Sequence, residues 1–260
     1  MSGRIDLNAD VGESLGPWRM GADTDLMPHL SSVNIACGFH AGDPLTIRRT
    51  VRLALDAGLA VGAHPGFPDL VGFGRRAMAI PPDELEAAIL YQVAALAGIV
   101  HAEGGRLAHV KAHGALYHHV ASDAAAATAF ATAVVRLDPG LAVVGPPGAA
   151  CLEAASRLGL RCLVEGFADR VYEADGRLRS RTLPGALNDD PRAAAEQAVR
   201  IARDGQVRAI DGSVVAVPAD TICIHGDTAG APEIAAAVHR GLEAAGIEVG
   251  PRTGEPARER

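Results

Sequence analysis

The chain repeats one pattern seven times: a short apolar run is followed by a polar or glycine-rich tip and, in most cases, by a helix-length segment rich in Ala and Leu. Apolar runs of four or five residues indicate buried strands, and the helical segments between them indicate that the strands are parallel. The pattern therefore predicts an α/β fold whose sheet is covered by helices. The predicted strands cover residues 5–9, 32–36, 60–63, 107–110, 141–145, 161–164 and 221–224.

Seven such units, with polar residues at nearly every strand end, favour a seven-stranded β/α barrel over the alternative, an open doubly wound sheet. We expect one barrel domain over residues 1–250, with hairpin excursions at 171–182 and 206–218 and a flexible tail at 251–260. The predicted helices cover residues 43–57, 82–104, 122–136, 148–158, 190–204 and 231–245.

Charge and hydropathy exclude two classes of partner. The 260 residues carry 24 basic and 31 acidic side chains, and only 3% are aromatic. The sequence therefore lacks the excess of basic residues that is typical of nucleic-acid-binding proteins. The apolar runs are short, and the first residues lack a basic region followed by an apolar one. We therefore expect a cytoplasmic protein with no membrane partner.

The basic residues are almost all arginines rather than lysines. Lys111 is the only lysine, and all the other basic residues are arginines. Arginine replaces lysine readily as a solvated charge, but not as a compact ammonium or a titratable amine. The position of Lys111 at the end of a predicted strand therefore marks it as a candidate functional residue.

Polar side chains gather at strand ends, which meet at one face of a parallel barrel. Asp10 and Glu13 follow the first strand, and Lys111 and His113 follow the fourth at a spacing that places both on one strand face. Carboxylates can act as a general base, bind a metal or orient a substrate, and a lysine beside an imidazole can hold a phosphoryl group or a developing negative charge. These four residues are the predicted catalytic set. The predicted substrate- or phosphate-binding residues are His40, His64, Arg75, Arg76, Glu165, Asp169 and His225.

Two of the strand-end histidines have the same surroundings. His40 and His64 are each followed by small residues and then by an aspartate. Either histidine could bind a divalent cation, or both could donate protons or stabilise an oxyanion without a metal. Spacing alone leaves both interpretations open.

One glycine-rich loop carries two adjacent guanidinium groups, on Arg75 and Arg76, within the string GFGRR. Such a loop suits the capture of a phosphate or another anion. The sequence has no G-x-x-x-x-G-K-[ST] string, so any use of ATP does not rest on a P-loop of this chain.

Seven strings occur in order along the chain: NADVGE, CGFHAGD, GAHPGFPD, GFGRR, VKAHGALY, EGFADR and IHGD. Together they resemble the LamB/YcsF family from about Ile5 to Val249. The resemblance implies the family's characterised role as the A subunit of 5-oxoprolinase, which opens the lactam of 5-oxo-L-proline to L-glutamate with hydrolysis of ATP. It also implies B and C subunits as partners and a barrel similar to the glycoside hydrolase/deacetylase type.

The resemblance also implies roles for the predicted residues. Lys111 and one arginine of the glycine-rich loop would hold phosphate or the substrate carboxylate, and Asp10 or Glu13 would deprotonate water. His113 would protonate the departing ring nitrogen. By analogy with the wider superfamily, Asp10, His40 and His64 would hold a divalent cation such as Mg²⁺.

Two other functions stay open at this point. One is a metal-dependent carbohydrate N-deacetylase that needs no ATP. The other is a non-catalytic subunit that binds the substrate and passes it to its partners.

Overall fold

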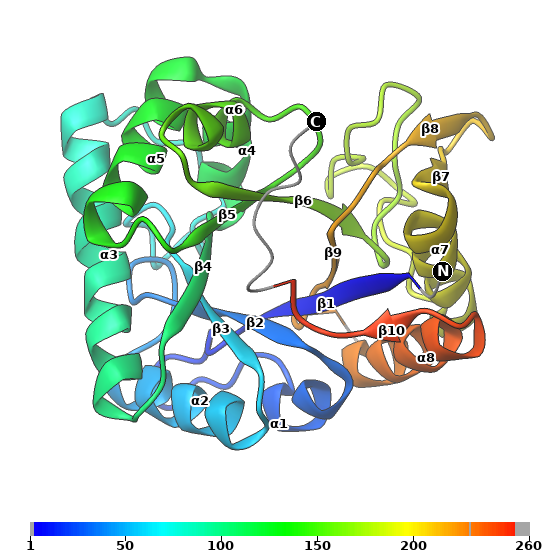
Figure 1. The fold of residues 1–260 in the computed structure, drawn as a ribbon, viewed down its shortest axis with the longest axis horizontal. Helices are drawn as coiled ribbons and strands as arrows, with labels where there is room; N and C mark the ends of the chain where they lie inside the picture. The colour runs from blue at the N-terminus through cyan, green and yellow to red at the C-terminus, as the bar shows by residue number, and fades with distance from the viewer. Residues whose placement is uncertain (1–2, 229, 253–260) are drawn as a thin grey trace. The chain divides into compact units, whose positions relative to one another are not determined.

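The computed structural model describes residues 3–228 and 230–252. Seven parallel strands form a β/α barrel, and their hydrogen-bonded order is β1-β2-β3-β4-β5-β6-β9 with β1 also paired to β9. The barrel fold is confirmed, and the open-sheet alternative is wrong because β1 has a partner on both sides (Figure 1). The strands are β1 (Arg4–Val11), β2 (Ser32–Ala36), β3 (Ala60–His64), β4 (Leu107–Lys111), β5 (Ala142–Gly145), β6 (Arg161–Phe167) and β9 (Thr221–Ile224), and the short β10 (Glu248–Val249) pairs with β1.

All six predicted helices match single helices in the structure to within two residues at each end. The helix predicted over 122–136 is α5, and a further helix, α4, precedes it and was not predicted. Asp123 separates them: its backbone is extended and its carboxylate accepts the N–H of Ala126, which caps the second helix. The helices are α1 (Asp23–Leu26), η1 (Met27–His29), α2 (Pro44–Asp56), α3 (Pro82–Ala102), α4 (Gly114–Ser122), α5 (Ala124–Leu137), α6 (Ala150–Arg157), α7 (Pro191–Asp204) and α8 (Ala231–Ala244).

The chain divides into two compact units. Unit 1 holds residues up to 9, 22–32 and 164–252, and unit 2 holds residues 10–21 and 33–163. The single domain over 1–250 stays a prediction. The predicted tail falls, from residue 253 onward, outside the described residues.

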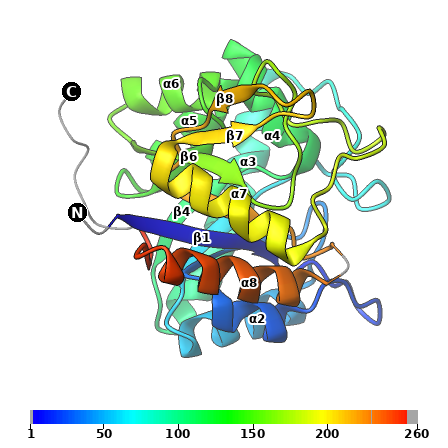
Figure 2. The same ribbon diagram turned by 90° about the vertical axis from the view of Figure 1, so that its right-hand side faces the viewer.

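In unit 1, β9 lies between β1 and β6, with Leu7 opposite Ile222 on one side and Glu165 opposite Thr221 on the other. Helices α7 and α8 pack against each other (Figure 2). The antiparallel strands β7 (Gln206–Arg208) and β8 (Val214–Ala216) lie within the segment predicted as the second hairpin. The first predicted hairpin forms no named strands, but an isolated antiparallel bridge joins Tyr172 and Leu178.

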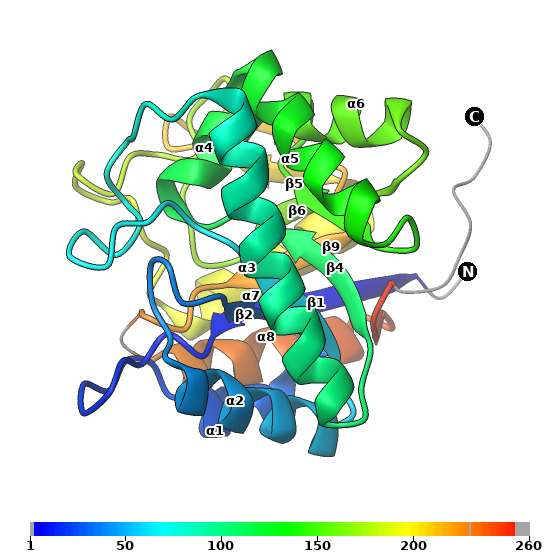
Figure 3. The same cartoon turned by 90° about the vertical axis from the view of Figure 1, so that its left-hand side faces the viewer.

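In unit 2, the long helix α3 packs against β3, β4 and α5 (Figure 3). It is long and apolar enough by composition to cross a membrane, as is the bent pair α4–α5 taken together, but core helices of soluble proteins pass the same test. A stripe of side chains at helical spacing faces the interior of the protein, as expected for a core helix. The stripe consists of Leu85, Ile89, Val93, Leu96 and Val100.

Gly62 lies where the pairing register between β3 and β4 shifts, and a Cβ atom there would lie 2.1 Å from Nε2 of the buried His109. We expect Gly62→Ala to lower the free energy of unfolding by about 1–3 kcal/mol, because the packed strand has no room for a methyl group. Gly98→Ala is the matched control, since a Cβ atom at this position within α3 meets nothing within 4 Å. It should raise stability by about 0.5–1 kcal/mol. Denaturant unfolding measures both, and equal stability of the two variants would contradict the packing argument.

Candidate functional site

Several predicted site residues lie together in unit 2, and the strand ends place them. Asp10 lies near the end of β1, and His64 and Lys111 are the last residues of β3 and β4. Glu13 follows β1 through a turn at Gly12, whose φ of 72° favours glycine and whose missing side chain leaves room for Ile35 and Thr50.

His113 reaches the site by a different route from the one that the sequence predicted. The strand ends at Lys111, and His113 is the extended N-cap residue of α4. Strand alternation therefore does not explain why the two side chains lie close together. The abrupt start of the helix at Gly114, which has a φ of 53°, holds His113 beside the strand ends.

Asp10 and Lys111 form a buried ion pair, with Nζ of Lys111 3.1 Å from Oδ1 of Asp10. The side-chain amide of Asn34 donates to the same oxygen at 2.9 Å, and its Oδ1 accepts a hydrogen bond from Nε2 of His109 at 2.7 Å. Only 2% of Lys111 is exposed, so its ammonium depends on this carboxylate for a counter-charge. The side chain of the only lysine is therefore buried within the site and is not a solvated surface charge.

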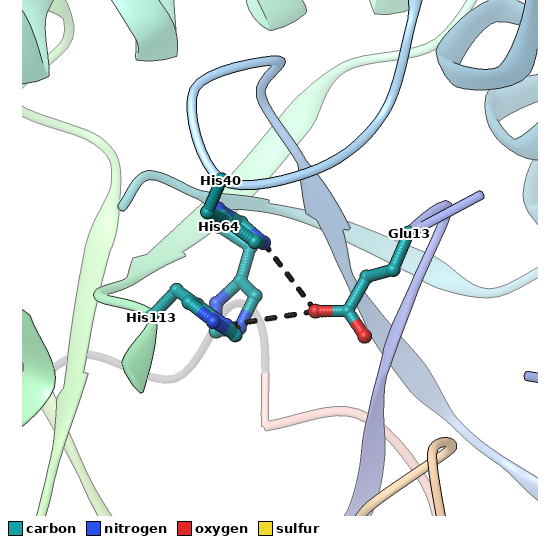
Figure 4. Close-up of side chains that lie close together, drawn as sticks. All are labelled: Glu13, His40, His64 and His113. Atoms are coloured by element: carbon teal, nitrogen blue, oxygen red, sulfur yellow. Dashed lines mark hydrogen bonds and ion pairs between the residues drawn. The ribbon is translucent and has the colours of Figure 1, made fainter. Parts of the chain in front are cut away.

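Glu13, His40, His64 and His113 form a second cluster beside the ion pair (Figure 4). Oε1 of Glu13 lies 3.3 Å from Nε2 of His40 and 3.5 Å from Nδ1 of His113. Nδ1 of His113 lies 3.0 Å from Nε2 of His64, and the His40 and His113 rings stack in parallel with centroids 3.7 Å apart. One potential ligand atom from each residue lies within 4.8 Å of all the others.

Backbone carbonyls determine which nitrogen carries the proton in two of these rings. Nδ1 of His64 lies 2.8 Å from the carbonyl oxygen of Lys111, and Nε2 of His113 lies 2.8 Å from that of Phe73. A carbonyl only accepts hydrogen bonds, so both of these nitrogens must donate. When both rings are neutral, the unprotonated nitrogens of His64 and His113 face each other across 3.0 Å. Two facing lone pairs beside a carboxylate require a shared cation, either a proton or a metal ion.

The surroundings disfavour a proton on two of the three rings. Burial, followed by the charge of His64, lowers the pKa of His113 to about 3. Burial also lowers the pKa of His40 well below its ordinary range, and charges on His113 and His64 lower it further. Neutral imidazoles are the form that binds metal ions.

The donor set fits a divalent metal ion. Three imidazole nitrogens and a carboxylate oxygen suit Zn²⁺ and similar ions better than Mg²⁺, which prefers oxygen. Tetrahedral ligands at about 2.0–2.1 Å from a metal are roughly 3.4 Å apart. Three of the ligand pairs are close to this value, at 3.0, 3.3 and 3.5 Å, and all four atoms lie within 4.8 Å of one another. The carbonyl of Lys111 that fixes His64 is the kind of outer partner that metal-binding histidines have.

The sequence identified only part of this cluster as a metal site. It grouped His40 and His64 with Asp10, whereas the structure groups them with Glu13 and His113. Oδ2 of Asp10 lies 3.3 Å from Nε2 of His64, while its Oδ1 is bound by Lys111 and Asn34. No spacing rule could find the observed set, because each ligand follows a different strand.

The two arginines of the glycine-rich loop differ in their contacts. The guanidinium of Arg76 is bound to the carboxylate of Asp69, whose pKa it lowers to about 2. The exposed Arg75 lies over the ring of Phe73, with Cζ 4.9 Å from the ring centroid, and its charge lowers the pKa of both His40 and His113. The two adjacent guanidinium groups therefore have different surroundings: Arg76 is paired with Asp69, and Arg75 lies over the ring of Phe73 near the cluster.

The other predicted binding residues lie in unit 1. Oε1 of the buried Glu165 accepts a hydrogen bond from the side chain of Asn8 at 3.2 Å. Nδ1 of His225 lies 3.0 Å from both oxygens of Asp169, and the Phe167 ring stacks on His225. Burial raises the pKa of Asp169, but the interactions with His225 outweigh it and lower the pKa overall. Nδ1 of His225 therefore donates to this carboxylate, which fixes the orientation of the ring.

Three residues that contribute to the site were not singled out from the sequence. Asn34 and His109 extend the Asp10 network, and the carbonyl of Phe73 fixes His113. A polar residue inside the apolar run 32–36 was a usable signal for Asn34. A backbone carbonyl leaves no signal in sequence, because every residue has one.

Comparison with known proteins gives consistent matches over nearly the whole chain. The LamB/YcsF family model matches residues 5–256. A Chloroflexus aggregans protein, named as the A subunit of 5-oxoprolinase, is 55% identical, covering 94% of this chain and 97% of the relative. A Thermus thermophilus protein with the same name is 52% identical, covering 95% and 98% respectively. The crystal structure of a lactam utilization protein from Thermus thermophilus matches with 51% identity and a TM-score of 0.90, covering 95% of this chain and 99% of that one.

The buried His109 should make stability depend on pH. Burial, followed by the charge of Lys111, lowers its pKa from an ordinary 6.5 to about 3. Below about pH 6.5 the unfolded chain binds a proton that the folded chain does not, so this stabilisation is lost as the pH falls from 6.5 toward 3. We expect His109→Gln to reduce the slope of unfolding free energy against pH by up to about 1.4 kcal/mol per pH unit in this range.

Urea unfolding at a series of pH values measures this slope. His118→Gln is the control, because His118 is exposed on α4 and should leave the slope unchanged. An equal slope in wild type and His109→Gln would contradict the assignment of a neutral buried imidazole.

Proposed function

The chain belongs to the LamB/YcsF family, and we propose that it acts as the A subunit of a 5-oxoprolinase, which hydrolyses the lactam of 5-oxo-L-proline to L-glutamate. The observation that carries the proposal is the buried cluster of unit 2, in which an ammonium, two carboxylates and three imidazoles lie together at strand ends. Burying so many titratable groups is costly unless they act on a substrate or a bound ion. The proposed enzyme also contains B and C subunits, and we expect it in the cytoplasm.

The proposed reaction uses ATP to activate the lactam, because an unactivated lactam resists hydrolysis. Transfer of the γ-phosphoryl group to the lactam oxygen gives a phosphorylated, imidate-like ring and ADP. Water then adds to the ring carbon, the ring C–N bond breaks as the nitrogen gains a proton, and a second water releases phosphate from the resulting acyl phosphate. The products are glutamate, ADP and phosphate. Since this chain lacks a P-loop string, the proposal assigns ATP to the assembled enzyme.

The contacts in unit 2 support particular roles for the catalytic residues. Asp10 is placed to accept the proton of water, because Lys111 and Asn34 orient its carboxylate. Arg75 would bind the substrate carboxylate or the phosphoryl group, and the Lys111 ammonium would stabilise the charge that develops on oxygen. The sequence assigned proton donation to His113, but its N–H is bound to the Phe73 carbonyl. We therefore assign the proton of the ring nitrogen to Lys111.

We further propose that Glu13, His40, His64 and His113 hold a divalent metal ion of the zinc class. Such an ion polarises a carbonyl or phosphoryl oxygen and lowers the pKa of water. Glu165, Asp169 and His225 remain proposed substrate-binding residues.

The same cluster also favours a second candidate function, metal-dependent removal of an N-acetyl group from a carbohydrate. That reaction also cleaves an amide, but it consumes no ATP. Dependence on ATP therefore separates the two functions.

The deciding assay measures glutamate and ADP release from 5-oxoproline and ATP, with the chain alone and with candidate B and C subunits present. We expect coupled release of both products only in the mixture. Release of acetate from an N-acetyl sugar by the chain alone, with no turnover of 5-oxoproline in the mixture, would overturn the proposal in favour of the deacetylase.

In the mixture, Lys111→Arg should lower turnover at least about 100-fold, because a guanidinium is a poor proton donor and fills the buried site differently. Arg208→Lys makes the reverse exchange on β7 in unit 1, at an exposed position, and should leave turnover unchanged.

The metal proposal is tested by titrating the metal-free chain with Co²⁺ and recording its visible absorption. We expect one ion per chain, with the intense absorption of tetrahedral Co²⁺. Glu13→Gln should weaken binding by about 100-fold or more, and His118→Gln on the surface of α4 should bind like wild type. The same weak absorption in wild type and Glu13→Gln would show that a shared proton, not a metal, separates the facing nitrogens.

A further inference from the structure

We propose that Phe73 is a positioning residue: its carbonyl determines which nitrogen of His113 faces the cluster, and the ion pair between Asp69 and Arg76 holds Phe73 in place. The inference deepens the proposed metal site and rests on it only for the second readout, Zn²⁺ affinity. Its structural part concerns the tautomer of one imidazole, which can be measured without substrate, ATP or partner subunits.

Phe73 has a backbone conformation that is unfavourable for its side chain. Its φ is 52°, and among the described residues it is the one non-glycine residue with a positive φ. A conformation of this kind is strained and persists only where neighbouring contacts enforce it. Here it directs the carbonyl of Phe73 toward Nε2 of His113, at 2.8 Å.

The loop lies directly on two imidazoles of the cluster. The Phe73 ring meets the His40 and His113 rings edge-on, with centroids 5.7 and 5.1 Å away. A Cβ atom on Gly74 would lie 2.7 Å from Cβ of His40 and 2.8 Å from Cδ2 of His113. The carbonyl of Gly74 also accepts the N–H of Ala115, in the first turn of the helix that His113 caps. The loop and His113 are therefore fixed against each other.

Asp69 binds the loop residues that precede and follow Phe73. Its carboxylate accepts the N–H of Gly72 at 2.9 Å and binds Nε of Arg76 at 3.0 and 3.1 Å, with a further contact to Nη2. Its backbone carbonyl accepts the N–H of Gly74 at 2.9 Å. The Asp69 side chain is 3% exposed and that of Arg76 is 64% exposed, so Arg76 supplies the counter-charge of a buried carboxylate. These bonds span Phe73 and enforce its strained backbone.

The consequence for the cluster is a choice between two tautomers. Without the Phe73 carbonyl, His113 could carry its proton on Nδ1 and donate it to Nε2 of His64, which would be an ordinary hydrogen bond. With the carbonyl in place, the proton stays on Nε2, and two lone pairs face each other across 3.0 Å. The loop thereby turns a stable contact between two histidines into a site that requires a cation. The predicted phosphate-binding role of Arg76 is replaced in this proposal by a role in holding the loop.

The test uses Arg76→Gln with Arg177→Gln as its matched control. Arg177 is also an exposed loop arginine, and its Nε donates to the carboxylate of Asp175, which is bound by a backbone N–H as well. Histidine ¹⁵N NMR of the metal-free full-length chain reports which ring nitrogen carries the proton. We expect His113 to be protonated on Nε2 in wild type and in Arg177→Gln, and to shift toward Nδ1 in Arg76→Gln.

Zn²⁺ titration gives the second readout. Affinity should fall about 10–100-fold in Arg76→Gln, as for the loss of other groups that orient metal ligands, and should not change in Arg177→Gln. Asp69→Asn is the second loop variant and should shift the His113 tautomer in the same direction. The proposal is overturned if wild-type His113 carries its proton on Nδ1, or if Arg76→Gln leaves both the tautomer and Zn²⁺ affinity unchanged. A failure of the 5-oxoproline assay would leave these two readouts standing, so the two proposals fail separately.

Discussion

The buried ion pair between Lys111 and Asp10 is the interaction on which the candidate site depends. The ammonium neutralises a carboxylate at the end of β1, while the carbonyl of the same lysine accepts the Nδ1 proton of His64. One residue at the end of β4 therefore supplies both the ion-pair partner of Asp10 and the carbonyl that fixes the tautomer of a neighbouring imidazole. Arginine at this position would keep the backbone carbonyl but exchange the compact ammonium beside Asp10 for a larger guanidinium.

The second constraint is an unfavourable contact that the fold maintains. Phe73 adopts a strained backbone, and its carbonyl holds His113 so that an unprotonated nitrogen faces His64. Together they leave an unprotonated nitrogen where the proposed cation would bind, at the cost of backbone strain in the loop. Strain and unfavourable electrostatics occurring together in one loop indicate a site shaped for function rather than for stability.

The barrel could be predicted because its signal is local and repeated. All seven predicted strands form, because short apolar runs bounded by turn residues are typical of buried strands. Helix α4 was not predicted, because the sequence places Lys111 and His113 on one strand face, whereas the turn at Gly114 begins a helix directly after His113. For the site, the sequence proposed residues that the fold brings together in unit 2, but it gave no sign of the contact between Arg76 and Asp69.

The sequence by itself determined the fold class, the family and the set of titratable residues at strand ends. These follow from periodicity and from motifs that each occupy a few neighbouring positions. Only the tertiary structure decided that Glu13 and His113, rather than Asp10, complete the histidine cluster. It also decided which ring nitrogens face inward, because that choice is made by the backbone carbonyls of Lys111 and Phe73. Every residue has a carbonyl, so its position relative to a distant side chain exists only once the chain has folded.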